Sequence, residues 1–421
     1  MDIEAVWAYV LLMALVVGVV ALPPFRAVDN TAESTSRYAS IDGLRGFLAL
    51  GVFVFHLVVT YRFNQTGVWT PPTSRFYALL GPVGVSLFFM ITGFLFWGKL
   101  LRARGRPDWR ALFVGRLFRI GPMYLAVVVM MLIFVFAHTG LTLREPGAQV
   151  ASSILQWLAL GMIDTQPAVN GYEARHVLAG VTWTIFYEWA FYLSLLGTAW
   201  FARGRHHLVF VTAALVLAMA GLATWQLPAF GFAALFQCGM AVASLLHANV
   251  RPNLPDSLAS ALALSCLALV FVLSRGAYGG ANALLLAVFF YLVCTSATLF
   301  GLLTSMPARR LGNISYSLYL MQGLVLSAVF GIDRIKAAAT ASVPLHWLAG
   351  GLSALLLLVS AAVGYVCIER AGIQLGKRVT RPGIRQRVDQ EVGRNGPVAT
   401  PQQAIEIGRT SRPRQTESTQ P

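Results

Sequence analysis

The sequence is poor in charge and in cysteine. Of its 421 residues only 12% are Asp, Glu, Lys or Arg, whereas 57% are hydrophobic. A water-soluble domain of this length could not bury so many apolar residues, so the composition points to a membrane protein. No two cysteines stand at CxxC spacing, which argues against a disulfide framework or a thiolate metal site, and we expect no metal. The cysteines all lie in apolar runs: Cys238, Cys266, Cys294 and Cys367.

Charge is missing above all from long apolar runs. A helix needs about 20 residues to cross the hydrocarbon core of a bilayer. Ten runs fit this requirement and give eleven spans, because the run 208–246 is long enough for two; only one run carries a charged residue, Glu188. The predicted spans are 5–22, 46–61, 76–98, 120–136, 181–202, two within 208–246 hinged near Trp225 and Pro228, 257–274, 283–303, 311–330 and 345–367. We therefore predict an all-α polytopic membrane protein.

The predicted spans divide into one extra helix and a core of ten. Residues 1–37 form an added N-terminal transmembrane helix with its linker, retained because no small-residue cleavage site follows it. Residues 38–370 form the membrane core. Residues 371–421 are rich in Arg, Gln, Pro, Thr and Ser, a composition that buries too little apolar surface to fold alone. They are predicted to be a disordered basic tail.

Basic residues fix the expected orientation. Cytoplasmic loops carry an excess of Lys and Arg, and the segment 99–119 is the most basic loop. With this loop inside, 25 of the 32 basic residues fall on the cytoplasmic side. The N-terminus is then outside and the C-terminus cytoplasmic. The net charge of +15 is accounted for by this topology, so we expect the lipid bilayer as a partner and no nucleic acid.

Two polar residues share one face of the second predicted span. Arg45 and His56 are eleven residues apart, which is close to three helical turns and about 16 Å along the axis. Arg45 would sit at the cytoplasmic mouth and His56 deeper in the membrane, where an ionisable side chain is costly and therefore a candidate for function. A neutral imidazole is a natural general base for a hydroxyl. The alternative is a histidine that snorkels to the outer headgroups.

Three further charged side chains are candidate site residues. Arg116 and Arg119 stand three apart and share a helix face at the cytoplasmic surface. Two guanidinium groups there could bind phosphates, although simple anchoring at the membrane surface explains them equally well. Glu188 lies several residues inside a span and needs a partner or a proton.

Five segments, in this order, resemble acyltransferase family 3 of integral membrane O-acyltransferases. They are IDGLRG with the following His56, GVSLFFMITGF (84–94), RLFRIGPMY (116–124), WTIFYEWAFY (183–192) and LGNISYSLYL (311–320). Considered alone, GVSLFFMITGF and SYSLYL indicate no more than close helix packing and interhelical hydrogen bonds. The resemblance covers residues 38–370.

The resemblance implies an activity and a location. Members of the family transfer an acyl group, usually acetyl from cytoplasmic acetyl-CoA, to sugar hydroxyls of surface polysaccharides, lipopolysaccharide and related glycolipids in the bacterial inner membrane. The family's catalytic Arg and His match Arg45 and His56. Its paired arginines match Arg116 and Arg119, and its mid-chain glutamate matches Glu188, which we expect to be catalytic together with Arg45 and His56. We expect CoA to contact Arg45, Arg116 and Arg119, and His56 to activate the acceptor.

Two positions depart from the family pattern. The usual Ser of its SGF motif is Thr92, which keeps a hydroxyl, and a frequent His after SYSLYL is Gln322, which cannot act as a base. Any proton transfer by that second histidine is therefore absent here or moved.

Two rival functions and one open segment remain. A transporter or flippase of a lipid-linked glycan would also need intramembrane polar groups, but would be expected to show internal repeats, and none is visible. A non-catalytic scaffold would gain nothing from buried charges. In the outer segment 138–180, the apolar stretch 151–162 is predicted to be a re-entrant or interfacial helix that either covers the acceptor site or only packs in the membrane.

Overall fold

The computed structural model describes residues 2–29, 38–274 and 278–380. Within these ranges the regular structure is helical, apart from one isolated β-bridge between Val169 and Tyr172. Seven helical stretches are long and apolar enough to cross a membrane, and a bent pair of helices makes an eighth. The prediction of an all-α polytopic membrane protein is confirmed.

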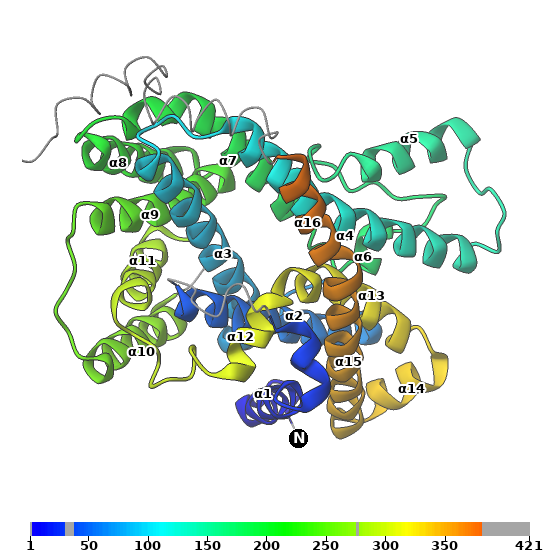
Figure 1. Ribbon diagram of the computed structural model, residues 1–421. Coiled ribbons are helices and arrows are strands. Elements are labelled where there is room, and N and C mark those ends of the chain that lie inside the picture. Colours follow the sequence, from blue (N-terminus) through cyan, green and yellow to red (C-terminus); the bar gives the residue numbers. More distant parts are fainter. Residues whose placement is uncertain (1, 30–37, 275–277, 381–421) are drawn as a thin grey trace, which may run out of the picture.

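The long helices surround a central pair. In Figure 1, α2 and α3 lie in the middle, with α8 to α11 on one side and α4, α5 and α13 to α16 on the other. The seven long stretches are α2 (Ala39–Thr66), α3 (Arg75–Arg102), α4 (Trp109–His138), α8 (His207–Trp225), α9 (Pro228–His247), α10 (Asp256–Leu273) and the combined stretch Val343–Val379. The bent pair is α12 (Met306–Asn313) with α13 (Ser315–Phe330), whose axes differ by 69°.

Every predicted span overlaps a helix, but the predicted span 283–303 runs eight residues past the helix end at Thr295, and not every helix is long. The shorter ones are α1 (Val6–Val20), α7 (Trp183–Thr198) and α11 (Gly280–Thr295). The count of eleven crossings therefore stays a prediction. The expected division of residues 208–246 is confirmed, because α8 ends at Trp225 and α9 begins at Pro228. Gln226 between them has a left-handed backbone, and proline suits the first turn of a helix, where its missing N–H is not needed.

Glycines allow α3 to lie directly against α9. A methyl group on Gly93 would overlap the carbonyl oxygen of Phe236, and one on Gly239 would overlap that of Met90. Small residues of this kind let helix backbones approach closely in membranes, where packing rather than hydrophobicity drives association. The packing interpretation of GVSLFFMITGF is thereby confirmed for Gly93. The glycine also holds α3 in place next to the site described below.

Polar contacts hold α1 to the core at both ends. At its N-terminal end, Glu4 accepts hydrogen bonds from Thr73 N–H at 2.8 Å and Thr73 O–H at 2.7 Å. At the other end, Arg310 of α12 pairs with both carboxylate oxygens of Asp29, at 2.9 and 3.0 Å. The Arg310 guanidinium also donates to the carbonyls of Val20, Ala21 and Leu22. The carbonyls of Val20 and Ala21 stand at the end of α1, where the helix itself offers no N–H partner, so Arg310 caps α1.

The segment 138–180 returns toward the middle of the bundle. Its helix α5 spans Gly147–Leu158, close to the predicted 151–162. The Trp157 carbonyl accepts a hydrogen bond from the Tyr124 hydroxyl at 3.0 Å. Tyr124 lies 14 residues before the end of α4 at His138, about 21 Å along the helix. The segment therefore folds back along α4, which fits the re-entrant alternative (Figure 1).

The last described helix differs from the sequence prediction. Helix α15 (Val343–Gly364) continues through a π-helical turn, Tyr365–Glu369, into α16 (Arg370–Val379). Residues 371–379 are thus helical rather than part of a disordered tail, and residues 381–421 lie outside the described residues. The reason is packing: Gly372 and Gly376 face Phe118 and Pro122 of α4, where a larger side chain would collide. A polar composition concealed this apolar, small-residue face.

Candidate active site

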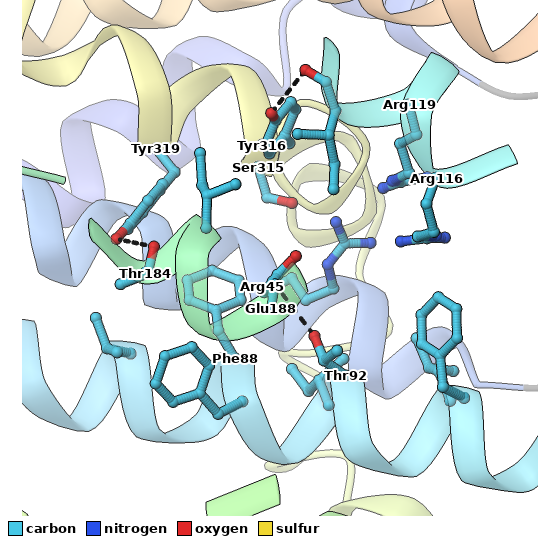
Figure 2. A pocket seen from close by; sticks show the side chains of 17 residues that line it. Arg45, Phe88, Thr92, Arg116, Arg119, Thr184, Glu188, Ser315, Tyr316 and Tyr319 are labelled. Carbon is cyan, nitrogen blue, oxygen red and sulfur yellow. Dashed lines mark hydrogen bonds between the residues drawn. The ribbon is translucent and has the colours of Figure 1, made fainter. Parts of the chain in front are cut away.

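Four of the predicted site residues line one cavity. The cavity measures about 160 Å³ and is lined by α2, α3, α4, α7 and α13. We call it the arginine cavity and define it by Arg45, Arg116, Arg119, Glu188, Tyr316 and Tyr319. Figure 2 shows the three arginine side chains pointing toward its interior from α2 and α4. Residues separated by up to 274 positions in the chain are brought together here.

Local structure explains where the arginines lie. Arg45 occupies the second turn of α2, and Arg116 and Arg119 follow one another by one turn on α4. The start of α4 is fixed by Asp108, whose side chain accepts a hydrogen bond from Ala111 N–H at 2.9 Å. Such an N-cap satisfies a backbone donor that the first helical turn leaves free. The arginines are therefore placed by two helix starts at the same end of the bundle.

The arginine cavity carries excess positive charge. Three guanidinium groups line it, against the single carboxylate of Glu188. Outside the lining, Arg45 has Asp42 at 3.9 Å and Arg119 has Glu369 at 3.9 Å. Contacts at this length compensate the charge only partly, and guanidinium groups bind phosphate oxygens in a bidentate geometry. The cavity is suited to a ligand with several negative charges.

Two hydroxyl groups hold Glu188. The Tyr192 O–H donates to one carboxylate oxygen at 2.9 Å, and Thr92 lies 3.4 Å from the other. Thr92 thus offers the hydroxyl that the sequence comparison expected of a serine. The guanidinium of Arg116 stacks over the Phe96 ring, 4.6 Å from its centroid. Glu188 has the partners that a carboxylate inside a span requires.

His56 does not line the arginine cavity. It lies farther along α2, is 8% exposed, and faces α13. Its Nδ1 is 3.2 Å from Oε1 of Gln322, and its backbone carbonyl accepts a hydrogen bond from Thr60 O–H at 2.8 Å. Arg45 and His56, which the sequence analysis placed on one helix face, therefore lie at two separate positions along α2. The link between them is α13, because Tyr319 lines the cavity and Gln322 is one turn farther on.

Gln322 fixes the tautomer of His56. The Gln322 side-chain N–H donates to the Tyr319 carbonyl at 2.8 Å, so its Oε1 faces the imidazole. An amide oxygen can only accept, which assigns the proton to Nδ1 and leaves the Nε2 lone pair free. The position that carries a frequent histidine in the family thus holds the partner that orients His56. Sequence comparison marked Gln322 as a departure but could not show this contact.

Glu369 is a buried charge that sequence reasoning missed. It is fully buried, in the π-helical turn after α15, and accepts a hydrogen bond from Ser317 O–H at 2.8 Å. Its other oxygen is the one near Arg119. In the sequence it follows the last predicted span and precedes Arg370, which is the pattern of charges at a membrane surface. The structure reveals it because the helix continues to Val379, which places Glu369 inside a long helical stretch.

Metal ligands are not grouped in the described part of the chain. Across residues 2–29, 38–274 and 278–380, no three His, Cys, Asp or Glu side chains are placed to hold one ion. The cysteines are free, and Cys238 is buried whereas Cys367 is exposed. The site is therefore described by its arginines, its glutamate and His56.

These observations define a class: a polytopic helical membrane protein with a basic cavity and a buried histidine on the same helix. A family model described as an acyltransferase domain matches residues 38–363, and the chain belongs to this family, acyltransferase family 3. A curated relative, acyltransferase MdmB of Streptomyces mycarofaciens, is 28% identical over 161 residues. This alignment covers 38% of each chain. No solved structure matches the chain.

Proposed function

We propose that the protein is a membrane O-acyltransferase that moves an acyl group, most simply acetyl, from acyl-CoA to a sugar hydroxyl of a cell-surface or lipid-linked glycan. The observation that carries this proposal is the arginine cavity, which a single helix, α2, connects to His56. Membership of an acyltransferase family supports the reaction type. The chemistry of the cavity supports the donor.

The donor is assigned to the arginine cavity. CoA carries several negatively charged phosphate groups, which complement the guanidinium groups of Arg45, Arg116 and Arg119. The carboxylates of Asp42 and Glu369 compensate the positive charge of these arginines only partly. Its phosphates would bind these groups while the acyl-thioester arm extends past Tyr319 toward Gln322 and His56. Tyr319 is held in that direction by its hydroxyl contact with Thr184 at 3.0 Å.

His56 is assigned as the general base. Its free Nε2 accepts the proton of the acceptor hydroxyl as the oxygen attacks the thioester carbonyl carbon. A new C–O ester bond forms, the C–S bond breaks, and CoA leaves as a thiolate that takes up a proton to become the thiol. Glu188, held by Tyr192, sets one negative charge against the three arginines that line the cavity. No step requires a metal or a redox partner.

The membrane placement follows the charge distribution. We propose that the protein resides in the bacterial cytoplasmic membrane with the arginine cavity facing the cytoplasm, where acyl-CoA is made. Most basic residues are then on the cytoplasmic side, as the positive-inside rule requires. The acceptor approaches from the opposite side.

Transfer of label tests the proposal directly. Purified protein in detergent is incubated with acetyl-CoA labelled in the acetyl group and with a glycan fraction from cells that lack the gene. Label is expected in the glycan with wild-type protein and not with His56→Ala, whose affinity for CoA should be unchanged. A flippase of lipid-linked glycans would transfer no label, and undiminished transfer by His56→Ala would refute the assignment of the base.

A further inference from the structure

A second cavity lies on the other side of His56. It measures about 230 Å³ and is bounded by α2, the loop after it, the segment 138–180 and the α13–α14 region. We call it the aromatic cavity and define it by Asn64, Trp69, Tyr172, His176, Asp333 and Lys336. Rings form part of its wall: Trp69 stacks on His176 with centroids 4.9 Å apart and planes 13° apart, and Phe63 meets Trp69 edge-on at 5.5 Å.

Two buried nitrogen atoms at this cavity have no protein partner. The Asn64 Nδ2 and the His176 Nε2 are shielded from solvent and make no hydrogen bond within the described residues. A buried polar group without a partner costs about 1–3 kcal/mol, and such groups are rare unless a ligand or water completes them. Both residues line the cavity. The nitrogens lie just behind the cavity wall, where a small rotation of either side chain would bring them to a ligand that offers hydrogen-bonding groups.

The aromatic cavity ends close to the base, although His56 is not one of its lining residues. The Trp69 ring is 6.4 Å from the His56 ring, and the cavity-lining Thr60 donates to the His56 carbonyl. On α13, Gly323 lines the cavity and directly follows Gln322, the partner of His56. His56 therefore lies between the arginine cavity and the aromatic cavity. A molecule in the aromatic cavity would lie beside Trp69 and Gly323, the two lining residues next to His56 and its partner Gln322, without entering the donor cavity.

Charge separates the two cavities further. The aromatic cavity contains one Asp, one Lys and neutral polar groups. Burial and the neighbouring Arg175 guanidinium lower the pKa of His176 below its ordinary value, so its ring is neutral near pH 7 and can both donate and accept hydrogen bonds. The cavity thus combines an apolar ring face with amide, imidazole, carboxylate and ammonium groups. This combination suits a molecule that has an apolar face and many hydroxyls.

We propose that the aromatic cavity binds the sugar ring of the acceptor, with Trp69 packing against its C–H face and Asn64 and His176 bonding its hydroxyls. This rests on the proposed function, which requires an acceptor, and adds where it binds and which residues select it. The segment 138–180 supplies Tyr172 and His176 and so forms one wall of the acceptor site. Asn64 and His176 are specificity residues, and Trp69 is a positioning residue that holds the sugar next to His56.

Steady-state kinetics with separate variation of the two substrates test the assignment. The acceptor probe is the glycan fraction of cells lacking the gene, the donor is labelled acetyl-CoA, and CoA affinity is measured independently by calorimetry. Trp69→Ala and Asn64→Ala should each raise the glycan KM at least about tenfold, the equivalent of 1.4 kcal/mol, and leave the Kd for CoA unchanged. Trp69→Phe should retain most of the affinity, because it keeps an aromatic face.

Trp225→Ala is the matched control, because that tryptophan is 66% exposed at the end of α8 and lines neither the arginine nor the aromatic cavity. Unchanged glycan KM in both Trp69→Ala and Asn64→Ala overturns the acceptor assignment while leaving the enzyme assignment intact. Absence of label transfer by wild-type protein overturns the proposed function itself. If Trp69→Ala loses CoA binding because it misfolds, the test rests on Trp69→Phe and Asn64→Ala. A purely structural role for the cavity predicts that the Kd for CoA and the glycan KM change in parallel in these variants.

Discussion

The arginine cavity and the aromatic cavity lie on either side of His56 and differ in the way they attract a ligand. The first is lined by three guanidinium groups and one carboxylate, which favours a polyanion. The second is walled by stacked rings and carries opposite charges and unpaired neutral donors, which favours a polyhydroxyl compound. Under the proposed assignments, the difference lets two substrates of unlike chemistry meet at one base without competing for one binding site.

Removing the basic pair should separate the two cavities most strongly. Arg116→Ala combined with Arg119→Ala removes two charged contacts of about 1.5–3 kcal/mol each. We expect the acetyl-CoA KM to rise at least about a hundredfold while the glycan KM stays within about twofold. The measurement is initial rate against each substrate in turn.

The control for this variant is Arg203→Ala, because Arg203 stacks on Trp200 and does not line the arginine cavity. A parallel rise in both KM values for the double variant would show that the arginines support the fold rather than the donor.

Changing the partner of His56 should affect the chemical step and leave ligand binding in both cavities unchanged. Gln322→Leu removes the acceptor that fixes Nδ1–H, so the imidazole loses its defined tautomer and orientation. Partners that orient metal-bound histidines contribute about 10–100-fold to activity, and by analogy we expect a loss of this size in kcat with both KM values retained.

Gln322→His restores a side chain that can bond His56 and should recover most of the rate. A wild-type rate in Gln322→Leu together with a low rate in Gln322→His would contradict the role of Gln322 in fixing the tautomer, because leucine offers no hydrogen bond.

Neutralising Glu188 should alter the arginine cavity alone. Glu188→Gln keeps an acceptor for Tyr192 but removes the charge that opposes the arginines. We expect kcat to fall about tenfold. The Kd for CoA should stay equal or tighten, because loss of the carboxylate makes the net charge of the cavity more positive. Thr92→Ser keeps the hydroxyl near Glu188 and should behave as wild type. Weaker CoA binding by Glu188→Gln would contradict the electrostatic role.

Ionic strength should give the smallest effect and still distinguish the two cavities. Salt screens charge attraction, with a Debye length near 10 Å at 0.1 M and near 3 Å at 1 M. The acetyl-CoA KM should rise by about two- to threefold over that range because phosphate binding depends on charge, whereas the glycan KM should barely change. Equal sensitivity of both substrates would mean that the aromatic cavity also binds through charge. The comparison is made in one detergent at constant pH.

Much of the architecture was predictable because lipid imposes simple rules. Apolar runs predicted the helices, the hinge at Trp225 and Pro228 followed from run length, and Arg45, Arg116, Arg119 and Glu188 were recognisable as charges in or beside spans. The weak point was the end of the core, where Gly372 and Gly376 pack on α4 inside a segment of polar composition. Composition gives the average polarity of a segment and does not show that one face of a helix carries small residues.

The sequence by itself determined the solvent, the helical class and the residues that carry charge into the membrane, because the cost of exposing polar groups to lipid acts on every residue separately. Only the tertiary structure decided which of these residues meet. It joined His56 to Gln322, Arg119 to Glu369 and Trp69 to His176. These pairs lie 266, 250 and 107 positions apart in the chain, and contacts at such separations depend on how helices pack, which no local pattern records. The two cavities on either side of His56 are a product of that packing.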